Sequence, residues 1–499
     1  MARRGRHVLA LDEGTTGTTA CVFDEAGRLV GKGYTELRQH YPRPGWVEHD
    51  PVEIWQKTKR SARAALRVAK ITARDVAAIG ITNQRETLVA WDARTGKPLS
   101  RAIVWQDRRT AALCERLRRA GDEDWVAKRT GLRFDPYFSG TKLRWYVEND
   151  RAVQRARRAR SLRFGTVDSW LLWNLTAGRV HGTDPSNASR TLLLDLRTVD
   201  YDEELLRLFG ARREELPTVL DSSGDLGEAT ADFVGRPLPV TGIAGDQQAA
   251  LFGQACFRPG LAKNTYGTGC FALANTGTRP AQARGGLLST VAWRIGRRTH
   301  YALEGAVFIA GAVVQWLRDE LQIIRHARET EALARSVPDT GGVILVPAFV
   351  GLGAPHWDPY ARGLLIGLTR GTNRAHIARA ALESIAFQSA EVVELLSLNA
   401  SRRVRTLRVD GGAAENNFLL QHQADVLGIP VERSAILETT AVGAAYLAGL
   451  GVDVWREADL ARKWRLGRRF EPQSTPRWRK ERLHAWHEAV RRSERWAAD

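Results

Sequence analysis

The sequence predicts an α/β protein whose two domains face each other across a cleft. Its 499 residues exceed what one compact core holds, and strands alternate with helices along the chain, as is typical of layered α/β folds. Each half also carries a strand–turn–strand segment rich in glycine and threonine, at residues 7–24 and 261–277. We therefore expect a duplicated unit, with domains at residues 1–254 and 255–499 that meet near a Pro-Gly turn.

The N-terminal half begins with a predicted β-meander whose first tight turn reads Asp-Glu-Gly-Thr-Thr-Gly. Asp50 and Pro51 are typical of the cap and the first residue of a helix, which we expect to continue to about Lys70. The strands expected in this half lie at residues 7–11, 18–24, from 29 onward, 77–81 and 87–92.

The C-terminal half repeats the alternation after its own glycine and threonine hairpin. Its last residues predict an amphipathic helix packed on the second domain through Leu483, Trp486 and Val490. The other elements expected here are helices at about 306–321 and 374–398, strands at 342–346 and 407–409, and a helix from about 414.

The composition is that of an ordinary globular protein, with 43% hydrophobic and 26% charged residues. We expect no membrane span, because no apolar run approaches roughly 18 residues. The first residues lack the apolar segment of a secretory signal. The four cysteines form no C-x-x-C pair, which favours free thiols in a reducing cytoplasm.

The net charge of +18 raises the question of nucleic-acid binding, since basic surfaces attract phosphates. The basic residues are spread along the chain, and the denser segments (residues 151–163 and the last forty) match no recognisable nucleic-acid motif. We therefore expect an arginine-rich solvated surface and no nucleic-acid partner.

The two glycine and threonine turns are candidate phosphate sites. Glycine lets the backbone approach an anion, and the turn's N–H groups and threonine hydroxyls donate hydrogen bonds. Asp12 ends the first strand, where it is suited to hold Mg²⁺ through water. Either turn alone fits an ordinary hairpin, but the pair indicates a cleft that clamps the phosphates of ATP.

Asp246, in Gly-Ile-Ala-Gly-Asp-Gln-Gln, stands where a predicted strand meets a helix. It suits the task of accepting a hydroxyl proton during phosphoryl transfer, but aspartate is equally common as a helix cap. Arg85 and Glu86 offer a planar donor fork beside an acceptor pair, and the alternative is a surface ion pair. The residues alone leave both questions open.

Two further groups of residues have alternative interpretations. Trp105 and Phe271 would shield the carbon side of a small polyol, or would belong to the core. The turn at residues 410–412 would let a flat base lie against its glycines. Gly311 and Gln315, four residues apart on one predicted helix, would complete that wall or serve helix packing.

A series of segments in a fixed order resembles the glycerol kinases, members of the FGGY family of sugar and polyol kinases in the actin-like ATPase superfamily. The resemblance implies two ribonuclease-H-like domains with a nucleotide and substrate cleft between them. It also implies ATP-dependent phosphorylation of glycerol to sn-glycerol 3-phosphate, the first step of glycerol catabolism. The segments include PRPGWVEHDPVEIW, GITNQRET, DPYFSGTK, SNASRT, GIAGDQQAALFGQ, KNTYGTGCF, YALEGAVFIAGA and LRVDGGAAENNFL.

The same resemblance implies roles for individual residues, with Asp246 as the general base and Asp12 as the residue that serves Mg²⁺. It further implies ATP and Mg²⁺ as cofactors and a homodimer or homotetramer. The residues expected to hold glycerol are Arg85, Glu86, Trp105, Tyr137, Asp246, Gln247 and Phe271. The residues expected to hold the nucleotide are Thr15, Thr16, Gly17, Thr268, Gly311, Gln315, Gly412 and Asn416.

The first turn departs from the family's usual D-Q-G-T-T-S-S-R, because Glu13, Gly17 and Thr19 replace Gln, Ser and Arg. Losing the arginine removes a positive charge near the phosphates, and Glu13 adds a negative one. We expect either weaker nucleotide binding or compensation by another basic group.

Two other functions are considered. A kinase of another small polyol or pentose is disfavoured by the complete N-Q-R-E-T and D-P-Y-F-S-G segments. A non-catalytic actin-like nucleotide switch would need no polyol pocket. Residue chemistry supports the ATP cleft in part, whereas glycerol as the acceptor rests on the resemblance.

Overall fold

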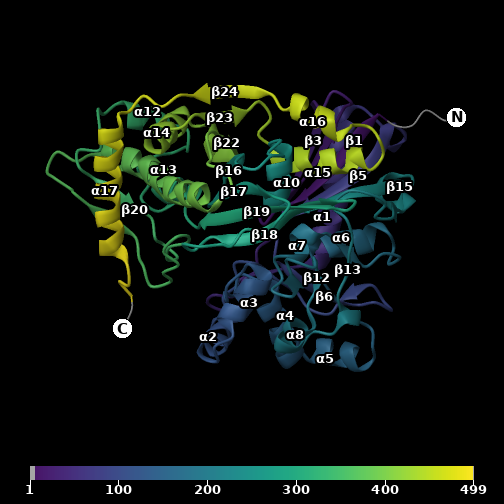
Figure 1. Ribbon diagram of the computed structural model, residues 1–499. Coiled ribbons are helices and arrows are strands. Elements are labelled where there is room, and N and C mark those ends of the chain that lie inside the picture. Colours follow the sequence, from purple (N-terminus) through teal and green to yellow (C-terminus); the bar gives the residue numbers. More distant parts are fainter. Residues whose placement is uncertain (1–5, 498–499) are drawn as a thin grey trace.

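The computed structural model describes residues 6–497, which form two large sheets, one from each half of the chain (Figure 1). In the N-terminal sheet, β1 pairs antiparallel with β2 and β2 with β3, while β1, β5 and β15 run parallel. The order is β14-β15-β5-β1-β2-β3, with β1 (His7–Glu13), β2 (Gly17–Phe23), β3 (Leu29–Glu36), β5 (Val76–Asn83), β14 (Glu228–Ala229) and β15 (Leu238–Gly245).

The C-terminal sheet repeats this arrangement. Its strands β19-β17-β16-β22-β23 have the order and directions of β3-β2-β1-β5-β15, so the predicted duplication is confirmed. The predicted boundary after Gln254 stays a prediction. The full order is β18-β19-β17-β16-β22-β23-β24, with β16 (Ala262–Tyr266), β17 (Cys270–Gly277), β18 (Leu288–Ile295), β19 (Arg298–Val307), β22 (Leu407–Asp410), β23 (Val431–Ser434) and β24 (Leu466–Phe470).

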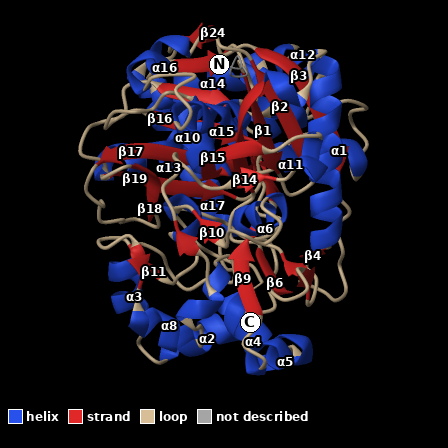
Figure 2. Ribbon diagram, turned by 90° about the vertical axis from the view of Figure 1, so that its right-hand side faces the viewer, coloured by secondary structure: helices blue, strands red, loops and turns tan. Residues whose placement is uncertain are grey.

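Helix α1 (Pro51–Ala69) packs on β2 and β3 and forms one outer side of the molecule (Figure 2). It starts as the sequence predicts, since Asp50 accepts hydrogen bonds from the backbone of Val52 and Glu53. Two glycines of β3 allow the close approach: a Cβ on Gly33 would lie 2.3 Å from the carbonyl oxygen of Ser61. Sequence and packing therefore agree at this element.

Two helices cross between the sheets and join the halves. Helix α10 (Asp246–Gly253) leaves β15 of the first sheet and packs on β16 and β17 of the second. Helix α15 (Thr439–Leu450) leaves the second half and covers β1, β5 and β15. A Cβ on Gly443 would lie 1.8 Å from the carbonyl oxygen of Ala249, so only glycine permits this crossing.

A separate lobe, inserted in the N-terminal half, lies below the two sheets in Figures 1 and 2. Its core contains the aromatic residues Phe134, Phe138, Tyr146, Phe164 and Phe209. The lobe combines a small sheet with short helices: β4 (Glu48–His49), β6 (Leu88–Asp92), β7 (Lys97–Pro98), β8 (Ala102–Ile103), β9 (Leu162–Thr166), α2 (Ala111–Arg119), α3 (Glu123–Thr130), α4 (Ser139–Asn149), α5 (Arg151–Arg158) and α8 (Glu203–Phe209).

The predicted C-terminal helix is confirmed as α17 (Pro476–Ser493). Trp486 is buried and stacks on Phe387 of α13 (Arg374–Asn399), with 5.4 Å between ring centroids.

The remaining elements are α6 (Val167–Leu175), α7 (Pro185–Ala188), α9 (Ala231–Val234), α11 (Gly311–Asp319), α12 (Glu329–Arg335), α14 (Asn417–Leu427), α16 (Glu457–Lys463), β10 (Gly182–Thr183), β11 (Leu194–Asp195), β12 (Asp200–Tyr201), β13 (Thr218–Val219), β20 (Ile344–Val346) and β21 (Leu364–Ile366), with 3₁₀ turns at Ala73–Asp75, Arg213–Glu215 and Gly412–Glu415.

The helix predicted from about residue 306 is wrong at its start. Strand β19 continues to Val307, which pairs with Cys270, and the helix begins at Gly311. The apolar run has no period that separates a buried strand from a buried helix, and the pairing with β17 decides between them.

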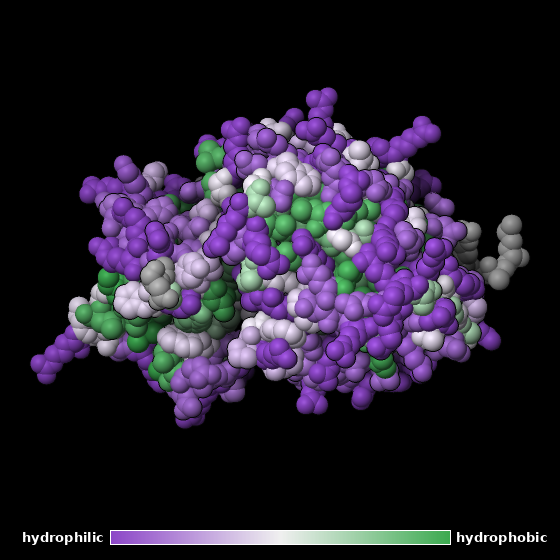
Figure 3. Space-filling model, turned by 90° about the horizontal axis from the view of Figure 1, so that it is seen from below, coloured by the Kyte–Doolittle hydropathy of each residue, from purple (hydrophilic) through white to green (hydrophobic). Residues whose placement is uncertain are grey.

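Hydrophilic side chains cover most of the face seen in Figure 3, and hydrophobic ones gather in its hollows. Within residues 6–497, no helix is both long and apolar enough to cross a bilayer. All four cysteines are buried free thiols, as expected.

Replacing Gly443 by Ala should destabilise the protein, because the added methyl group collides with the backbone of α10. We expect a loss of at least about 1–3 kcal/mol in the free energy of unfolding, measured by denaturant unfolding. The control is Gly371→Ala, since the nearest heavy atom to a Cβ there is 3.9 Å away. Equal stability of both variants would contradict close packing at the helix crossing.

Candidate functional site

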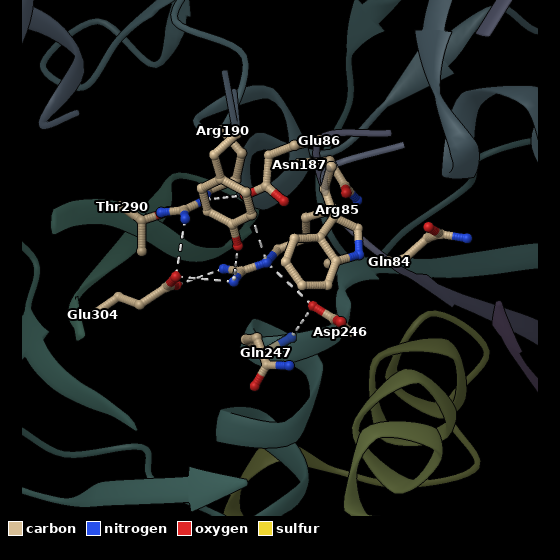
Figure 4. A network of polar contacts seen from close by, with 12 residues as sticks. Gln84, Arg85, Glu86, Asn187, Arg190, Asp246, Gln247, Thr290 and Glu304 are labelled. Atoms are coloured by element: carbon tan, nitrogen blue, oxygen red, sulfur yellow. Dashed lines mark hydrogen bonds and ion pairs between the residues drawn. The ribbon is translucent and has the colours of Figure 1, made fainter. Parts of the chain in front are cut away.

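The guanidinium of Arg85 lies between two carboxylates where the two halves meet (Figure 4). Its Nη1 donates to Glu304 Oε2 at 2.5 Å and its Nη2 to Glu304 Oε1 at 2.9 Å. On the other side its Nε lies 3.1 Å from Asp246 Oδ1. Arg85 follows β5, Glu304 lies on β19 and Asp246 begins α10, so three distant segments meet at one side chain.

A second arginine, Arg190, completes the network. Its Nε donates to Glu86 Oε1 at 2.7 Å and its Nη2 to Glu304 Oε1 at 2.9 Å. Arg190 and Glu304 are both 0% exposed, so each charge depends on these partners. We call Arg85, Glu86, Arg190 and Glu304 the buried ion network.

Sequence reasoning gave no role to Arg190 or Glu304. Both lie in segments that carry the resemblance, SNASRT and YALEG. No local spacing relates them, since 114 residues separate the two. Only the folded arrangement of β19 against the residues that follow α7 brings them together.

The charges of the site shift its pKa values. Burial alone would raise the pKa of Glu304, but Arg190 and Arg85 overcome it and lower that pKa to about 2. Burial dominates at Glu86 and raises its pKa despite its two arginines. Burial also raises the pKa of Asp246, against the charges of Arg85 and Lys263. Glu304 is thus a fixed anion, whereas Asp246 holds its proton more readily.

The backbone of Glu86 has a φ of 62°, in the left-handed region that residues other than glycine rarely adopt. The hydroxyl of Ser139, the first residue of α4, donates to the Glu86 carbonyl oxygen at 3.0 Å. Strained positions of this kind cluster at functional sites, where the surroundings enforce them. Here the turn lets Arg85 and Glu86 join the same network.

Three aromatic rings flank Arg85. Tyr137 and Trp105 have ring centroids 5.6 Å apart, and Trp105 and Phe271 have centroids 6.3 Å apart. Arg85 Nη2 also donates to the Tyr137 hydroxyl at 3.4 Å. Trp105 and Phe271 are only partly buried and pack against the edges of two core clusters. The site therefore combines polar groups with an apolar wall.

Lys263 connects the first turn of α10 to the second sheet through hydrogen bonds. Its Nζ donates to Gln247 Oε1, to Thr265 Oγ1 at 2.8 Å and to the Phe271 carbonyl oxygen at 3.1 Å. Burial lowers its pKa to about 8. The side-chain oxygen of Gln247 is therefore already engaged, and its contact with glycerol stays a prediction.

The two glycine and threonine turns each expose a threonine. In the first, Gly14 N donates to the Gly17 carbonyl oxygen at 3.0 Å, and Thr16 is exposed. In the second, Gly267 N donates to the Gly269 carbonyl oxygen at 2.9 Å, and Thr268 is exposed. Both therefore have the form of a turn that can receive phosphate.

Neighbouring residues fix these two turns. The hydroxyl of Thr15 accepts from Trp105 Nε1 at 2.8 Å, which joins the first turn to the aromatic wall. A Cβ on Gly311 would lie 2.6 Å from the Gly267 carbonyl oxygen, so α11 begins in contact with the second turn.

The structure explains two of the departures in the first turn. Glu13 lies against α1, where its Oε2 accepts from Thr18 at 2.6 Å and Thr58 at 3.0 Å. Burial raises its pKa to about 8, so the neutral acid prevails at neutral pH. The expected negative charge at the phosphates is therefore wrong. At Gly17 a Cβ would lie 2.5 Å from the hydroxyl of Tyr34, which occupies the space of a larger residue.

Asp12 remains the acidic group of the first turn. Among the described residues its carboxylate has neither a hydrogen bond nor an ion pair. Burial, and then the charge of Asp246, raise its pKa to about 7, and Lys32 opposes the rise. A carboxylate without a protein partner fits a hydrated Mg²⁺, which keeps several waters. Within residues 6–497 no group of three acidic, histidine or cysteine side chains could hold a metal, so other ligands would come from water or phosphate.

The residues of the predicted base wall differ in their exposure and contacts, and the wall itself stays a prediction. Gln315 is exposed on α11, and Gly412 is exposed beside Gly411, whose φ is 87°. Asn416 has other contacts: its Oδ1 accepts from Leu419 N at 3.0 Å, and its amide donates to Thr330 at 3.2 Å. Asn416 thus caps α14, and its contact with a nucleotide stays a prediction.

Comparisons with known proteins point to one family. The models for the N-terminal and C-terminal domains of the FGGY family of carbohydrate kinases match residues 7–253 and 262–452. A Thermotoga maritima protein named glycerol kinase 2 is 56% identical over 98% of this chain and 99% of its own. A Symbiobacterium thermophilum glycerol kinase is 56% identical over 99% of each chain. The crystal structure of Plasmodium falciparum glycerol kinase with ADP is 36% identical, has a TM-score of 0.89 and covers 98% of both chains.

Replacing Glu304 by Gln should strongly destabilise the protein, because two buried guanidinium groups lose their shared anion. We expect a loss of about 3–5 kcal/mol in the free energy of unfolding, measured by denaturant unfolding. Asp319→Asn, at an ion pair with a half-exposed carboxylate, serves as the control and should leave the unfolding midpoint nearly unchanged. If Glu304→Gln unfolds at the wild-type midpoint, the network does not depend on this anion.

Proposed function

Because the chain belongs to the FGGY family of carbohydrate kinases, we propose that it transfers the γ-phosphoryl group of ATP to glycerol and releases sn-glycerol 3-phosphate. One observation carries the proposal. Arg85, Tyr137 and Asp246 meet beside an aromatic wall, in a chain 56% identical to proteins named glycerol kinase. The chemistry of this site suits a small molecule with adjacent hydroxyl groups.

The acceptor is held by polar groups on one side and rings on the other. Arg85, Glu86, Tyr137 and Gln247 offer donors and acceptors to the hydroxyls, while Trp105 and Phe271 cover the carbon atoms. The ion network fixes Arg85 and Glu86 before the substrate arrives. Such preorganisation positions the hydroxyl for attack on the phosphoryl group.

Asp246 accepts the proton of the attacking hydroxyl. Its Oδ1 accepts from its neighbour Gln247 N at 2.7 Å and lies 3.1 Å from Arg85 Nε, so the carboxylate is oriented from two sides. General base catalysis of this kind contributes about 10²–10⁴-fold to a rate. Only the ionised form can act, and the raised pKa of Asp246 means that activity falls as the pH drops through that value.

The two turns hold the phosphates. Thr15, Thr16 and Gly17 approach them from the first half and Thr268 from the second. Gly311, Gln315, Gly412 and Asn416 surround the rest of the nucleotide. When bound near Asp12, Mg²⁺ neutralises phosphate charge. The loss of arginine at Thr19 leaves Lys32 as a basic group whose charge acts on Asp12.

Two other proposals accompany this function. The protein acts as a homodimer or homotetramer, and it works in the cytoplasm, consistent with four free thiols. A kinase of another polyol or pentose is the alternative within the family. A non-catalytic nucleotide switch is disfavoured, because such a switch needs no polyol pocket, whereas Arg85, Tyr137 and Asp246 meet beside an aromatic wall.

A direct assay separates these functions. ADP release is measured with glycerol and with a panel of other polyols and pentoses. Glycerol should give the highest kcat/KM. A substrate lacking one of its hydroxyls leaves buried polar partners unpaired, which costs about 10⁴-fold. A pentose that exceeds glycerol would replace the proposal with the alternative kinase.

Replacing Asp246 by Asn should abolish ADP release while leaving glycerol binding measurable by calorimetry. The amide keeps the shape of the side chain but cannot accept the proton, so kcat should fall by at least about 10²-fold. Asp225→Asn, at an exposed loop residue, serves as the matched control. Near-normal turnover of Asp246→Asn would exclude Asp246 as the base.

Replacing Asp12 by Asn should stabilise the ligand-free protein at pH 8. The pKa of Asp12 rises from its ordinary 3.8 to about 7, so folding favours the uncharged form. This contribution is complete below about pH 4 and is lost as the pH rises through 7. The thermal midpoint of the variant should therefore exceed that of the wild type increasingly between pH 5 and 8.

The same variant tests the proposed Mg²⁺ site. With ADP present, Mg²⁺ should raise the midpoint of the wild type more than that of Asp12→Asn. Identical responses of both proteins to Mg²⁺ would place the ion elsewhere.

A further inference from the structure

Tyr34, on β3, is an exposed aromatic residue beside the first phosphate turn. Its side chain is 57% exposed, although large rings gain most from burial. Among the described residues its hydroxyl makes one hydrogen bond, to the Thr16 carbonyl oxygen at 3.4 Å. Hydroxyl donors usually lie 2.5–3.0 Å from an acceptor, so this bond is a long one. The hydroxyl is therefore able to donate to a better acceptor.

The strand register places Tyr34 in one row with Asp12. Asp12 pairs with Thr19 of β2, and Thr19 pairs in turn with Tyr34 of β3. Directly paired residues of neighbouring strands point to the same face of a sheet. Neighbouring strands lie about 4.8 Å apart, so the row from Asp12 to Tyr34 spans roughly 10 Å.

This row lies on the face of the sheet that α1 does not cover. In Figure 2, β1, β2 and β3 lie side by side with α1 on their outer side. Gly33 faces α1, since a Cβ there would lie 2.3 Å from the Ser61 carbonyl oxygen. Successive residues of a strand alternate between faces, so Tyr34 points away from α1. Ala10 and Cys21, one step along the strands from the row, pack in the core cluster that contains residues of α10 and α15.

From this row Tyr34 reaches over the first phosphate turn. A Cβ on Gly17 would lie 2.5 Å from the Tyr34 hydroxyl oxygen. The hydroxyl therefore occupies the place where the serine usual in the family would begin its side chain. Thr19, the partner of Tyr34 in the register, stands where the family usually has arginine. Both of these departures thus lie against one side chain.

We propose that the Tyr34 hydroxyl donates a hydrogen bond to a phosphate oxygen of the nucleotide at the first turn. This inference rests on the proposed function, in which Thr15, Thr16 and Gly17 approach the phosphates. A hydrogen bond from a hydroxyl to an ionised phosphate is stronger than one to a backbone carbonyl, so the hydroxyl exchanges its long bond to Thr16 for this one. Tyr34 thereby supplies a donor at the turn without the positive charge of an arginine.

The probe is the β,γ-imido analogue of ATP, which carries three phosphates and does not transfer one. Its binding to the full chain is measured by calorimetry with Mg²⁺, and adenosine is the matched comparison without phosphate. Tyr34→Phe should weaken the analogue by at least about fivefold, because a hydrogen bond to a charged group is lost. The affinity for adenosine should stay unchanged.

A ring that only packs over Gly17 would bind the analogue equally well as tyrosine and as phenylalanine, and that result would overturn the proposal. An equal loss of affinity for adenosine would overturn it too, since the substitution would then act on the whole nucleotide site. The control is Tyr360→Phe, at a tyrosine of the C-terminal half that is 53% exposed. This variant should bind the analogue as the wild type does.

Serine at position 17 tests whether the two hydroxyls share one place. The φ of Gly17 is not in the left-handed region, so the backbone accepts serine. With Tyr34 present, Gly17→Ser should not strengthen binding of the analogue, because the hydroxyl of Tyr34 fills the space. In Tyr34→Ala the same change should recover about fivefold in affinity, since a new hydroxyl replaces the lost one. An equal effect of serine in both backgrounds would overturn the shared place.

Failure of this inference is distinguishable from failure of the proposed function. If the wild type binds the analogue and releases ADP with glycerol, but Tyr34→Phe binds the analogue equally well, only the inference fails. If the wild type binds the analogue but releases no ADP with glycerol, the proposed function fails and the contact of Tyr34 is still measured. A wild type that does not bind the analogue would overturn both.

Discussion

The structure depends on one interaction above the others, the buried ion network of Arg85, Glu86, Arg190 and Glu304. A buried charge is tolerated only with partners of excellent geometry, and here the partners come from both halves of the chain. Glu304 lies on β19 of the second sheet, while Arg85 and Arg190 belong to the first half. If the halves separated at this point, the network would be left with unpaired charges in a poorly solvated place. The relative position of the two domains and the shape of the acceptor site are therefore set by the same bonds.

The crossing helices α10 and α15 determine where the candidate base Asp246 lies. Helix α10 starts at Asp246, so the candidate base moves with the helix, and Gly443 of α15 holds the helix against its partner. Lys263 fixes the first turn of α10 to the second sheet through Gln247. The candidate base, the guanidinium beside it and the second sheet are thus connected through contacts of one helix. Preorganisation of this kind suits phosphoryl transfer, in which positioning and charge do most of the work.

Local signals in the sequence predicted much of the fold. The helix cap at Asp50 and the two glycine and threonine hairpins are predicted from local residue patterns, because neighbouring residues specify a turn or a cap. The partners of Arg85 are different. Glu304 lies 219 residues away, and no period or spacing connects the two. The helix predicted from about residue 306 also overlaps the end of the strand that carries Glu304, because an apolar run fits either helix or strand. Likewise, the sequence predicts a negative charge from Glu13 at the phosphates, whereas burial against α1 raises the pKa of Glu13 to about 8 and favours its neutral form.

The ligand-free cleft is electrostatically unfavourable, and this has a functional consequence. Burial raises the pKa of both Asp12 and Asp246, and the charge of Asp246 adds to the rise at Asp12. Lys32 opposes the rise at Asp12, and Arg85 and Lys263 oppose it at Asp246. A cation at Asp12 and a hydroxyl at Asp246 would each relieve part of the cost of ionisation. Ligands that bind only the folded state stabilise it by mass action. If Mg²⁺ binds at Asp12 and glycerol at Asp246, as proposed, the two carboxylates lower the stability of the free protein in exchange for tighter binding of these ligands.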